Sequence, residues 1–291
     1  PFFQGRGIDE STLNELITER EKLQATESVD WSDEGSVLAA LQQSGATLQY
    51  APEELKKNRE LVFAAVKQNG TALHYASSEL KQDYKLVLAA VEQNGNALEH
   101  ASNELKQQRD LVLAAVKQNG SLLKFASKEL LHDLDLLLTA VRQNGSALQY
   151  ASEELKQDPE LVLAALQQNG SAFQYASQKL KKDRIFVLGA VQHNGSVLQY
   201  ASEKLKNNAS VVLIASVLDD TVCLRFASEE LREQFKSRQL QQRGAVFMAA
   251  VQIYGNVLKL ASEVLQEDRK LVLAAVTQSG TALEHASKEL R

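Results

Sequence analysis

The sequence has few of the residues that interrupt helices or cross-link chains. Its 291 residues include three prolines, one cysteine and 6% aromatic side chains. The lone cysteine, Cys223, excludes an internal disulfide, and the shortage of proline favours a largely helical chain. No apolar run reaches the roughly 18 residues that a membrane-spanning helix needs. We therefore expect no membrane insertion, and the compartment, cytoplasmic or organellar, stays open.

A basic excess is also missing. The chain has 32 Lys and Arg against 37 Asp and Glu, a net charge of −5. Proteins that bind nucleic acids or anionic membranes usually carry a basic surface, so the composition disfavours both functions. The chain starts at Pro1 without an initiator methionine or an apolar signal segment, and we expect it to be processed or part of a longer protein.

What the sequence does contain is an internal repeat. Glycine recurs every 25 residues at 45, 70, 95, 120, 145, 170 and 195, and the pattern returns at Gly255 and Gly280. Alignment on these glycines gives ten copies, with Asp220 in the glycine position of the eighth. Because a unit this small cannot enclose its own core, the repeat predicts units that are stabilised by stacking on their neighbours.

The first half of each unit is predicted to be a helix. Asp158 is a typical N-cap residue, and Pro159 follows at the first helical position. A six-residue apolar block comes next, 61–66 in the second copy, and predicts a helix buried on all sides. We expect the Asn-Gly that follows to end this helix, with glycine in the left-handed conformation. The equivalent N-cap positions hold Asn58, Asp83, Asp133, Asp183, Asn208 and Asp268. One small position of the block holds Ala40, Ala65, Ala90, Ala115, Ala140, Ala165, Ala190, Ala215, Ala250 and Ala275.

The second half predicts a second helix and a short third turn. Thr, Asn or Ser follows the glycine in nine copies and is a candidate N-cap for the second helix. An aromatic residue precedes an alanine near its end in most copies, as in Tyr75-Ala76. Pro52 predicts that the helix of the first copy breaks at Ala51. Elsewhere a serine such as Ser77 is expected to cap the third turn, whose leucine, found in all ten copies, is expected in the core.

These patterns predict an all-α fold, an α-solenoid of ten short two-helix repeats with an N-terminal capping helix. Residues 1–30 form the extension and capping helix, and 31–291 form the repeats. The last copy lacks a polar cap, so we expect either that the array continues or that a partner covers it. The eighth copy carries an insertion at about 229–244. This insertion is either a protruding contact element or a tolerated bend in the superhelix.

Two sets of residues are candidates for contact with a partner. The first belongs to the insertion: Phe235, Lys236, Arg238 and Arg243. The second is the variable position before the aromatic residue, which holds Gln49, His74, Glu99, Lys124, Gln149, Gln174 and Gln199. Variation at one position of a regular array suits a surface that meets an irregular partner such as a protein. It equally suits an unselected surface.

No pattern of catalytic or cofactor-binding residues is present. The five histidines lack the spacing of zinc motifs, and His100 and His285 fall in the aromatic position. The single repeated glycine is not a phosphate-binding loop, and Cys223 lies in an apolar stretch. We therefore expect no enzyme, no cofactor and no metal ion.

Two rows of residues that recur along the repeats leave RNA binding open as an alternative function. One lysine per unit, as at Lys56, and one aromatic residue per unit could together bind single-stranded RNA, with bases stacked on the rings. Most of these lysines lie within two residues of a glutamate, which favours a solvated edge with local ion pairs. A third possibility is a spacer without a ligand.

The unit at 111–130, LVLAAVKQNGSLLKFASKEL, resembles a tandem helical-repeat family catalogued as a domain of unknown function. Its catalogued unit corresponds to two of these copies, about 50 residues. The family occurs in protist and algal proteins and in effector-like proteins of intracellular bacteria. The resemblance covers about residues 33–291, departs in the eighth copy at Asp219-Asp220, and implies no catalytic residues. The chain is also similar to other short-unit helical solenoids, which mostly bind proteins. We therefore predict a protein-interaction scaffold, either a module of a larger protein or a structural subunit of an assembly, with protein partners.

Overall fold

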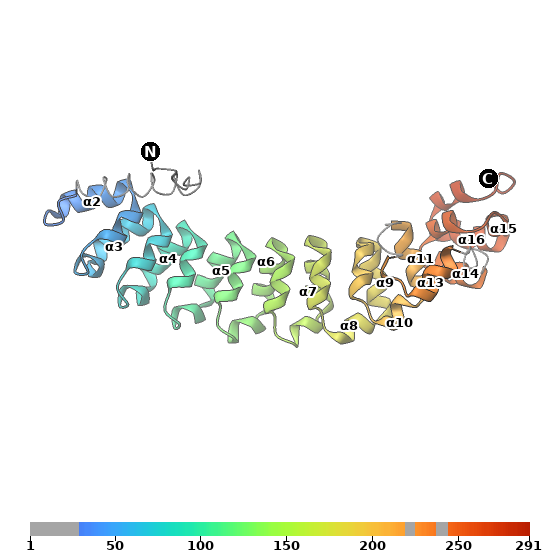
Figure 1. The fold of residues 1–291 in the computed structure, drawn as a ribbon, viewed down its shortest axis with the longest axis horizontal. Helices are drawn as coiled ribbons and strands as arrows, with labels where there is room; N and C mark the ends of the chain where they lie inside the picture. Colours follow the sequence, from blue (N-terminus) through green and yellow to red (C-terminus); the bar gives the residue numbers. More distant parts are fainter. Residues whose placement is uncertain (1–28, 219–224, 237–243) are drawn as a thin grey trace, which may run out of the picture. The chain divides into compact units, whose positions relative to one another are not determined.

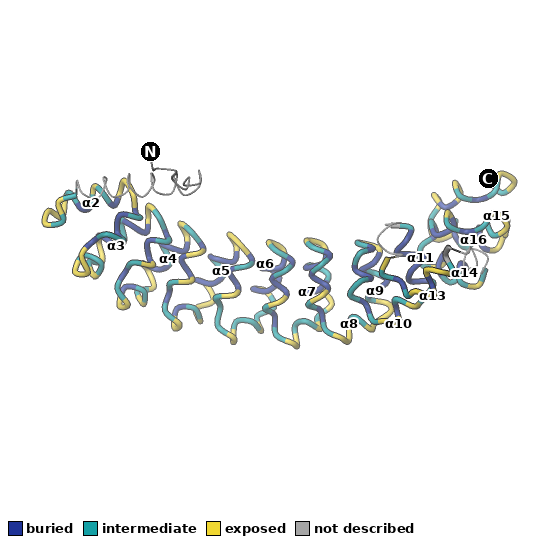
Figure 2. Tube along the Cα trace, viewed as in Figure 1, coloured by how far each residue is buried: buried dark blue, intermediate teal, exposed yellow. Residues whose placement is uncertain are grey.

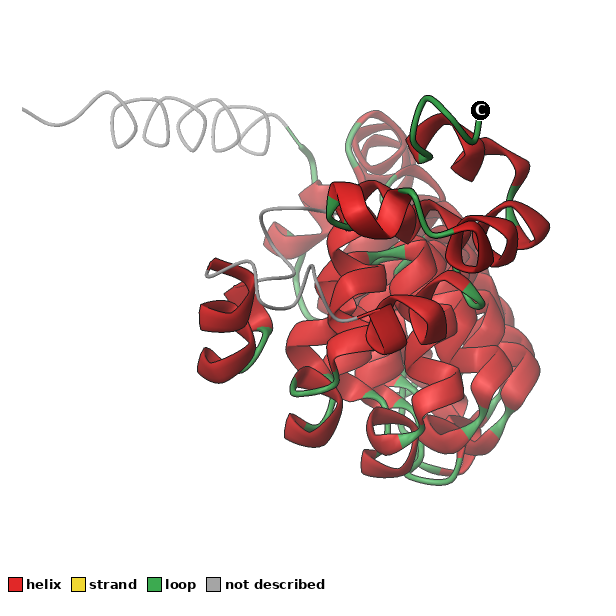
Figure 3. Ribbon diagram, turned by 90° about the vertical axis from the view of Figure 1, so that its right-hand side faces the viewer, coloured by secondary structure: helices red, strands yellow, loops and turns green. Residues whose placement is uncertain are grey.

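The computed structural model describes residues 29–218, 225–236 and 244–291, and helices are their only regular secondary structure (Figures 1 and 3). The all-α repeat architecture is therefore confirmed. The expected capping helix at 1–30, apart from its last two residues, and Cys223 lie outside the described residues. The chain forms two compact units, 1–130 and 131–291. Each unit is described by itself.

The first unit repeats one pattern: an α-helix, a six-residue 3-10 helix and a short third turn. Its α-helices lie side by side in chain order (Figure 1). They are α2 (Glu34–Gln43), α3 (Arg59–Gln68), α4 (Tyr84–Gln93) and α5 (Arg109–Gln118). The 3-10 helices are η1 (Gly45–Tyr50), η3 (Gly70–Tyr75), η5 (Gly95–His100) and η7 (Gly120–Phe125), and the third turns are η2 (Leu55–Lys57), η4 (Leu80–Gln82) and η6 (Leu105–Gln107). The turn η8 (Glu129–His132) spans the boundary between the units.

The second unit continues the pattern, and its third turns are longer from α8 onward. Its α-helices are α6 (Leu134–Gln143), α7 (Pro159–Gln168), α9 (Arg184–His193), α11 (Ala209–Leu218), α14 (Gly244–Val251) and α16 (Arg269–Gln278). The 3-10 helices are η9 (Gly145–Tyr150), η11 (Gly170–Tyr175), η12 (Gly195–Tyr200), η14 (Gly255–Leu260) and η15 (Gly280–His285). The third turns are η10 (Leu155–Gln157), α8 (Gln178–Lys182), α10 (Glu203–Lys206), α13 (Glu229–Lys236) and α15 (Glu263–Gln266).

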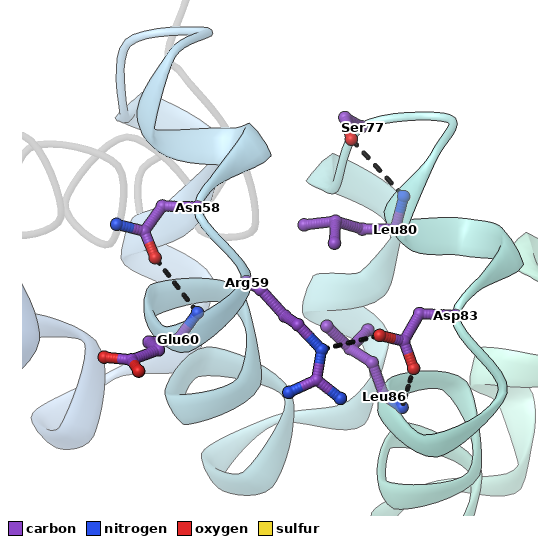
Figure 4. Close-up of polar contacts among 7 residues, drawn as sticks. All are labelled: Asn58, Arg59, Glu60, Ser77, Leu80, Asp83 and Leu86. Atoms are coloured by element: carbon purple, nitrogen blue, oxygen red, sulfur yellow. Dashed lines mark hydrogen bonds and ion pairs between the residues drawn. The ribbon is translucent and has the colours of Figure 1, made fainter.

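The predicted N-caps of the α-helices are confirmed. Asn58 Oδ1 accepts from the backbone N–H of Glu60 at 3.0 Å, and Asp83 Oδ1 accepts from Leu86 at 3.1 Å (Figure 4). Asp83 Oδ2 also accepts from Arg59 Nε of the preceding repeat at 2.6 Å, and this guanidinium lowers the pKa of Asp83 below its ordinary value. One side chain therefore caps a helix and joins two repeats.

In α3, α4, α5 and α7 the core is formed by four of the six positions of the apolar block (Figure 2). In α3 the exposed fraction is 1% for Leu61 and 0% for Val62, Ala65 and Val66. The third position is different: Phe63 and its counterparts Leu88, Leu113 and Leu163 are only half-buried. The expectation of a helix buried on all sides is wrong there, because the α-helices contact neighbouring repeats on two flanks and leave one edge open.

The predicted second helix is a 3-10 helix, and its N-cap is the asparagine before the glycine. Asn69 is extended, with φ −143° and ψ 103°, and its side chain accepts from the N–H of Thr71 at 3.2 Å. The expectation that the residue after the glycine is the cap is therefore wrong. That residue instead donates from its side chain to the asparagine, as Thr71 Oγ1 does to Asn69 Oδ1 at 2.7 Å. The helix ends where predicted, since Ala51 is extended.

The repeated glycine is required because the backbone of the next repeat lies too close for a side chain, and not because of its own backbone conformation. A Cβ atom at Gly45 would overlap the carbonyl oxygen of Ala65 in the next repeat. The expected left-handed conformation is wrong, because a positive φ is not found at Gly45, Gly70, Gly95, Gly145, Gly170, Gly255 or Gly280. The same overlap occurs at Gly70, Gly145 and Gly255 against Ala90, Ala165 and Ala275. The small alanine and the glycine together let adjacent repeats touch through their backbones.

At five of these glycines a glutamine of the next repeat joins the two repeats, an arrangement that we call the glutamine clamp. Gln93 Oε1 accepts from the N–H of Gly70 at 2.5 Å, and Gln93 Nε2 donates to the carbonyl oxygen of Gln68 at 3.2 Å. The bond to glycine recurs at Gly45–Gln68, Gly95–Gln118, Gly145–Gln168 and Gly255–Gln278. The clamp satisfies the buried glycine N–H, which would be costly to leave without an acceptor.

The third turn supplies another bond between repeats. Ser77 N–H donates to the carbonyl oxygen of Lys56 at 3.1 Å, and Ser77 Oγ accepts from Leu80 N–H at 3.4 Å, as predicted for a capping serine (Figure 4). Only some of the repeated leucines lie in the core as expected. Leu80, Leu105, Leu180, Leu205 and Leu231 are buried, whereas Leu55, Leu130, Leu155, Leu265 and Leu290 are half-buried.

Candidate functional site

The variable position of each repeat is held at the surface by the 3-10 helix. It is the fifth of six residues, immediately before the aromatic position. His74, Glu99, Lys124, Gln149 and Gln174 are exposed, and Gln49 and Gln199 are half-buried. We call these seven residues the slot residues. They lie one per repeat, on η1, η3, η5 and η7 in the first unit and on η9, η11 and η12 in the second, and their contact with a partner stays a prediction.

A slot residue contacts the aromatic position of the next repeat. Tyr75 Oη donates to Gln49 Oε1 at 3.1 Å. His74 Nδ1 lies 3.3 Å from Nδ1 of His100, which is the half-buried residue in the aromatic position of the following repeat. The partner is 26 residues away in both pairs. These contacts join Gln49, Tyr75, His74 and His100 in one row across three repeats, which sequence spacing within a single repeat does not reveal.

Some slot side chains also bond to their own 3-10 helix. Gln174 Nε2 donates to the carbonyl oxygen of Ser171, and Gln199 Nε2 donates to that of Ser196, each at 3.1 Å. In both cases the amide nitrogen points back to the backbone. The side-chain oxygen, an acceptor, and the second N–H of the amide then remain for a partner.

The lysine ladder folds against the protein. The amino groups of Lys56, Lys156 and Lys206 lie 2.8–2.9 Å from Glu53, Glu153 and Glu203, and these lysine side chains are only 14–18% exposed. Lys106 Nζ donates to the carbonyl oxygen of Glu99 at 2.7 Å, and Lys181 Nζ donates to that of Gln174 at 2.5 Å. Burial lowers the pKa of Lys106 and Lys181. The local ion pairs were expected, but the solvated edge is not found for these lysines.

The insertion is partly described. Residues 229–236 form α13, longer than the other third turns, and its Leu231 is 3% exposed and packs inward. Phe235 and Lys236 lie in the last turn of α13, whereas Arg238 and Arg243 lie outside the described residues. The Ser228 N–H donates to the carbonyl oxygen of Lys206 at 3.3 Å, so the backbone bond between repeats persists at the start of the insertion.

Within 29–218, 225–236 and 244–291, no group of three or more His, Cys, Asp or Glu side chains could hold a metal ion. In the same ranges no helix combines the length and the apolar character needed to cross a membrane. The pair formed by His74 and His100 is the titratable cluster that sequence reasoning missed, because the pair joins two repeats.

Comparison with known proteins identifies one family. A family model described as a domain of unknown function (DUF4116) matches residues 33–81, 83–131, 133–181, 183–232 and 246–291. The matches are tandem and each corresponds to two repeats, as the resemblance in the sequence implied. No curated protein and no solved structure matches the chain.

Proposed function

Because the chain belongs to the DUF4116 family of tandem helical repeats, we propose that it is a non-catalytic protein-interaction scaffold, either a module of a larger protein or a structural subunit of an assembly. The observation that carries the proposal is the contrast between the positions that hold the repeats together and the slot residues at the surface. Capping residues, clamp glutamines and core positions recur from repeat to repeat, whereas the slot residues change from Gln to His, Glu and Lys on identical backbones.

Such a surface suits recognition of a folded or extended protein. The row presents amide, imidazole, carboxylate and ammonium groups in turn, beside half-buried rings that combine apolar area with a polar edge. The 3-10 helices fix the backbone of the slot residues, which limits the entropy lost when a partner binds. Protein partners are therefore favoured over RNA, since the lysines that would track phosphates are bonded to carboxylate or carbonyl oxygens.

Site-specific photo-crosslinking tests this proposal. A photoreactive amino acid replaces Gln174, a slot residue on η11, in the chain expressed in its own source cell. The control replaces Gln167, an exposed glutamine on α7 of the same repeat. We expect discrete protein adducts from position 174 and none of the same adducts from position 167. Equal adduct patterns at the two positions, or adducts to RNA that fall steeply with salt, would count against the scaffold.

A further inference from the structure

His74 and His100 form an imidazole pair that joins the second and third repeats. Their Nδ1 atoms lie 3.3 Å apart, and the ring centroids are 4.6 Å apart with an interplanar angle of 61°. The edge of one further ring supports His74, since Tyr75 lies 4.9 Å away at 81°. Tyr75 is itself held by its hydroxyl bond to Gln49. The pair is therefore positioned by two 3-10 helices and a third neighbouring repeat.

The separation fits a shared metal ion. Two nitrogens that each lie about 2.0–2.1 Å from a tetrahedral zinc ion are about 3.3–3.4 Å from each other. The observed distance is longer than the roughly 2.7–3.2 Å usual for hydrogen bonds donated by N–H groups, so a direct bond between the rings is weak. The same two nitrogens are thus better placed to share an ion than to bond to each other.

The two rings differ in their exposure to solvent. His100 is half-buried. Metal ions bind the neutral form of imidazole. Glu99, beside His100, offsets the charge of a cation, while Lys81 and Lys106 oppose it. His74 is exposed, which gives an ion access from solvent.

We propose that His74 and His100 bind a divalent transition-metal ion such as Zn²⁺ through their Nδ1 atoms, with water in the remaining positions. On binding, the ring that carries its proton on Nδ1 moves that proton to Nε2, so both rings stay neutral and no net proton is released. Imidazole ligands select zinc, copper and nickel over magnesium and calcium. Two protein ligands make this an open, exchangeable site rather than a closed structural one.

The other repeats supply the variants that test the site. His74→Gln installs the residue found at Gln49, and His100→Tyr installs the residue found at Tyr50 and Tyr75. His285→Tyr is the matched control, because His285 also occupies the aromatic position but the residue 26 positions before it is Lys259 rather than a histidine. Circular dichroism of each full-length variant checks that the fold is retained.

Zn²⁺ is titrated into the metal-free chain by calorimetry in a non-chelating buffer at pH 7.5. We expect one site in the wild type and in His285→Tyr, and at least about tenfold weaker binding in His74→Gln and His100→Tyr. In the chain labelled with ¹⁵N-histidine, Zn²⁺ should shift the Nδ1 signals of two histidines, and these signals should be missing in the two variants. Equal affinity in all four proteins, no binding by the wild type, or shifts confined to other histidines would overturn the proposal.

Discussion

Substitution of the repeat glycine tests why adjacent repeats fit together. In Gly145→Ala the new Cβ would overlap the carbonyl oxygen of Ala165 and lie 3.1 Å from Asn169 Cβ. Both belong to the neighbouring repeat and one is backbone, so relief requires the repeats to separate. Overpacking of this kind costs about 1–3 kcal/mol. The separation would also stretch the 2.9 Å bond from Gly145 N–H to Gln168.

Gly189→Ala is the control, because it makes the same chemical change in the same unit. Gly189 lies in α9, nothing lies within 4 Å of its added Cβ, and other repeats hold alanine at this position, as at Ala164. Replacing a glycine inside a helix by alanine stabilises the folded protein by about 0.5–1 kcal/mol. The two substitutions should therefore change the urea midpoint of the full chain in opposite directions, and hydrogen exchange of the α7 amides should accelerate only in Gly145→Ala.

A third variant separates the steric explanation from a conformational one. A glycine needed for a left-handed backbone would tolerate asparagine better than alanine. A glycine that is needed because a side chain does not fit tolerates the larger asparagine less well than alanine. We expect Gly145→Asn to be less stable than Gly145→Ala. The reverse order, or a neutral Gly145→Ala, would refute the reasoning.

Three further outcomes follow from single contacts. Gln168→Ala should lower the free energy of unfolding by about 1–3 kcal/mol in urea titrations, because a buried glycine N–H loses its acceptor, whereas the exposed Gln167→Ala should change it by less than about 0.5 kcal/mol. The pKa of His100 is lower in the folded chain than in the unfolded chain. The stability that the neutral His100 contributes is therefore present above the unfolded pKa of about 6.5 and is lost as the pH falls through the folded pKa. The urea midpoints at pH 7.5 and pH 5.5 should differ less in His100→Tyr than in the wild type. Asp83→Ala loses both a helix cap and the bond to Arg59 and should cost about 0.5–2 kcal/mol in thermal unfolding; Asp83→Asn, which keeps the cap, should cost less.

Features that depend on neighbouring residues in the chain were predictable. The N-cap at Asn58, the break at Ala51 and the serine cap at Ser77 each rest on a residue whose bond lies within three positions. The helical repeat itself follows from the spacing of glycine and from the apolar block. The exposure of the slot residues His74, Glu99, Lys124, Gln149 and Gln174 agrees with the variation of their position in the sequence, whereas their role in contacting a partner stays a prediction.

Features that depend on the adjacent repeat were not predictable from local patterns. Asn-Gly after a helix usually indicates a left-handed cap, but the atom that excludes a side chain at Gly45 is the carbonyl oxygen of Ala65. The pairing of His74 with His100 likewise requires the register between two 3-10 helices. Lys106 was expected at a solvated edge, yet its amine reaches a carbonyl seven residues earlier.

The most direct test of the scaffold proposal compares the chain in its native particle with the isolated chain. Hydroxyl-radical footprinting of both samples measures the solvent access of each side chain. The account predicts a native particle larger than 32.1 kDa, with Tyr150, Tyr175 and the adjoining slot residues protected relative to the isolated chain, while Gln167 is labelled equally in both. A native particle of 32.1 kDa, or equal labelling of the slot row in the two samples, would contradict it.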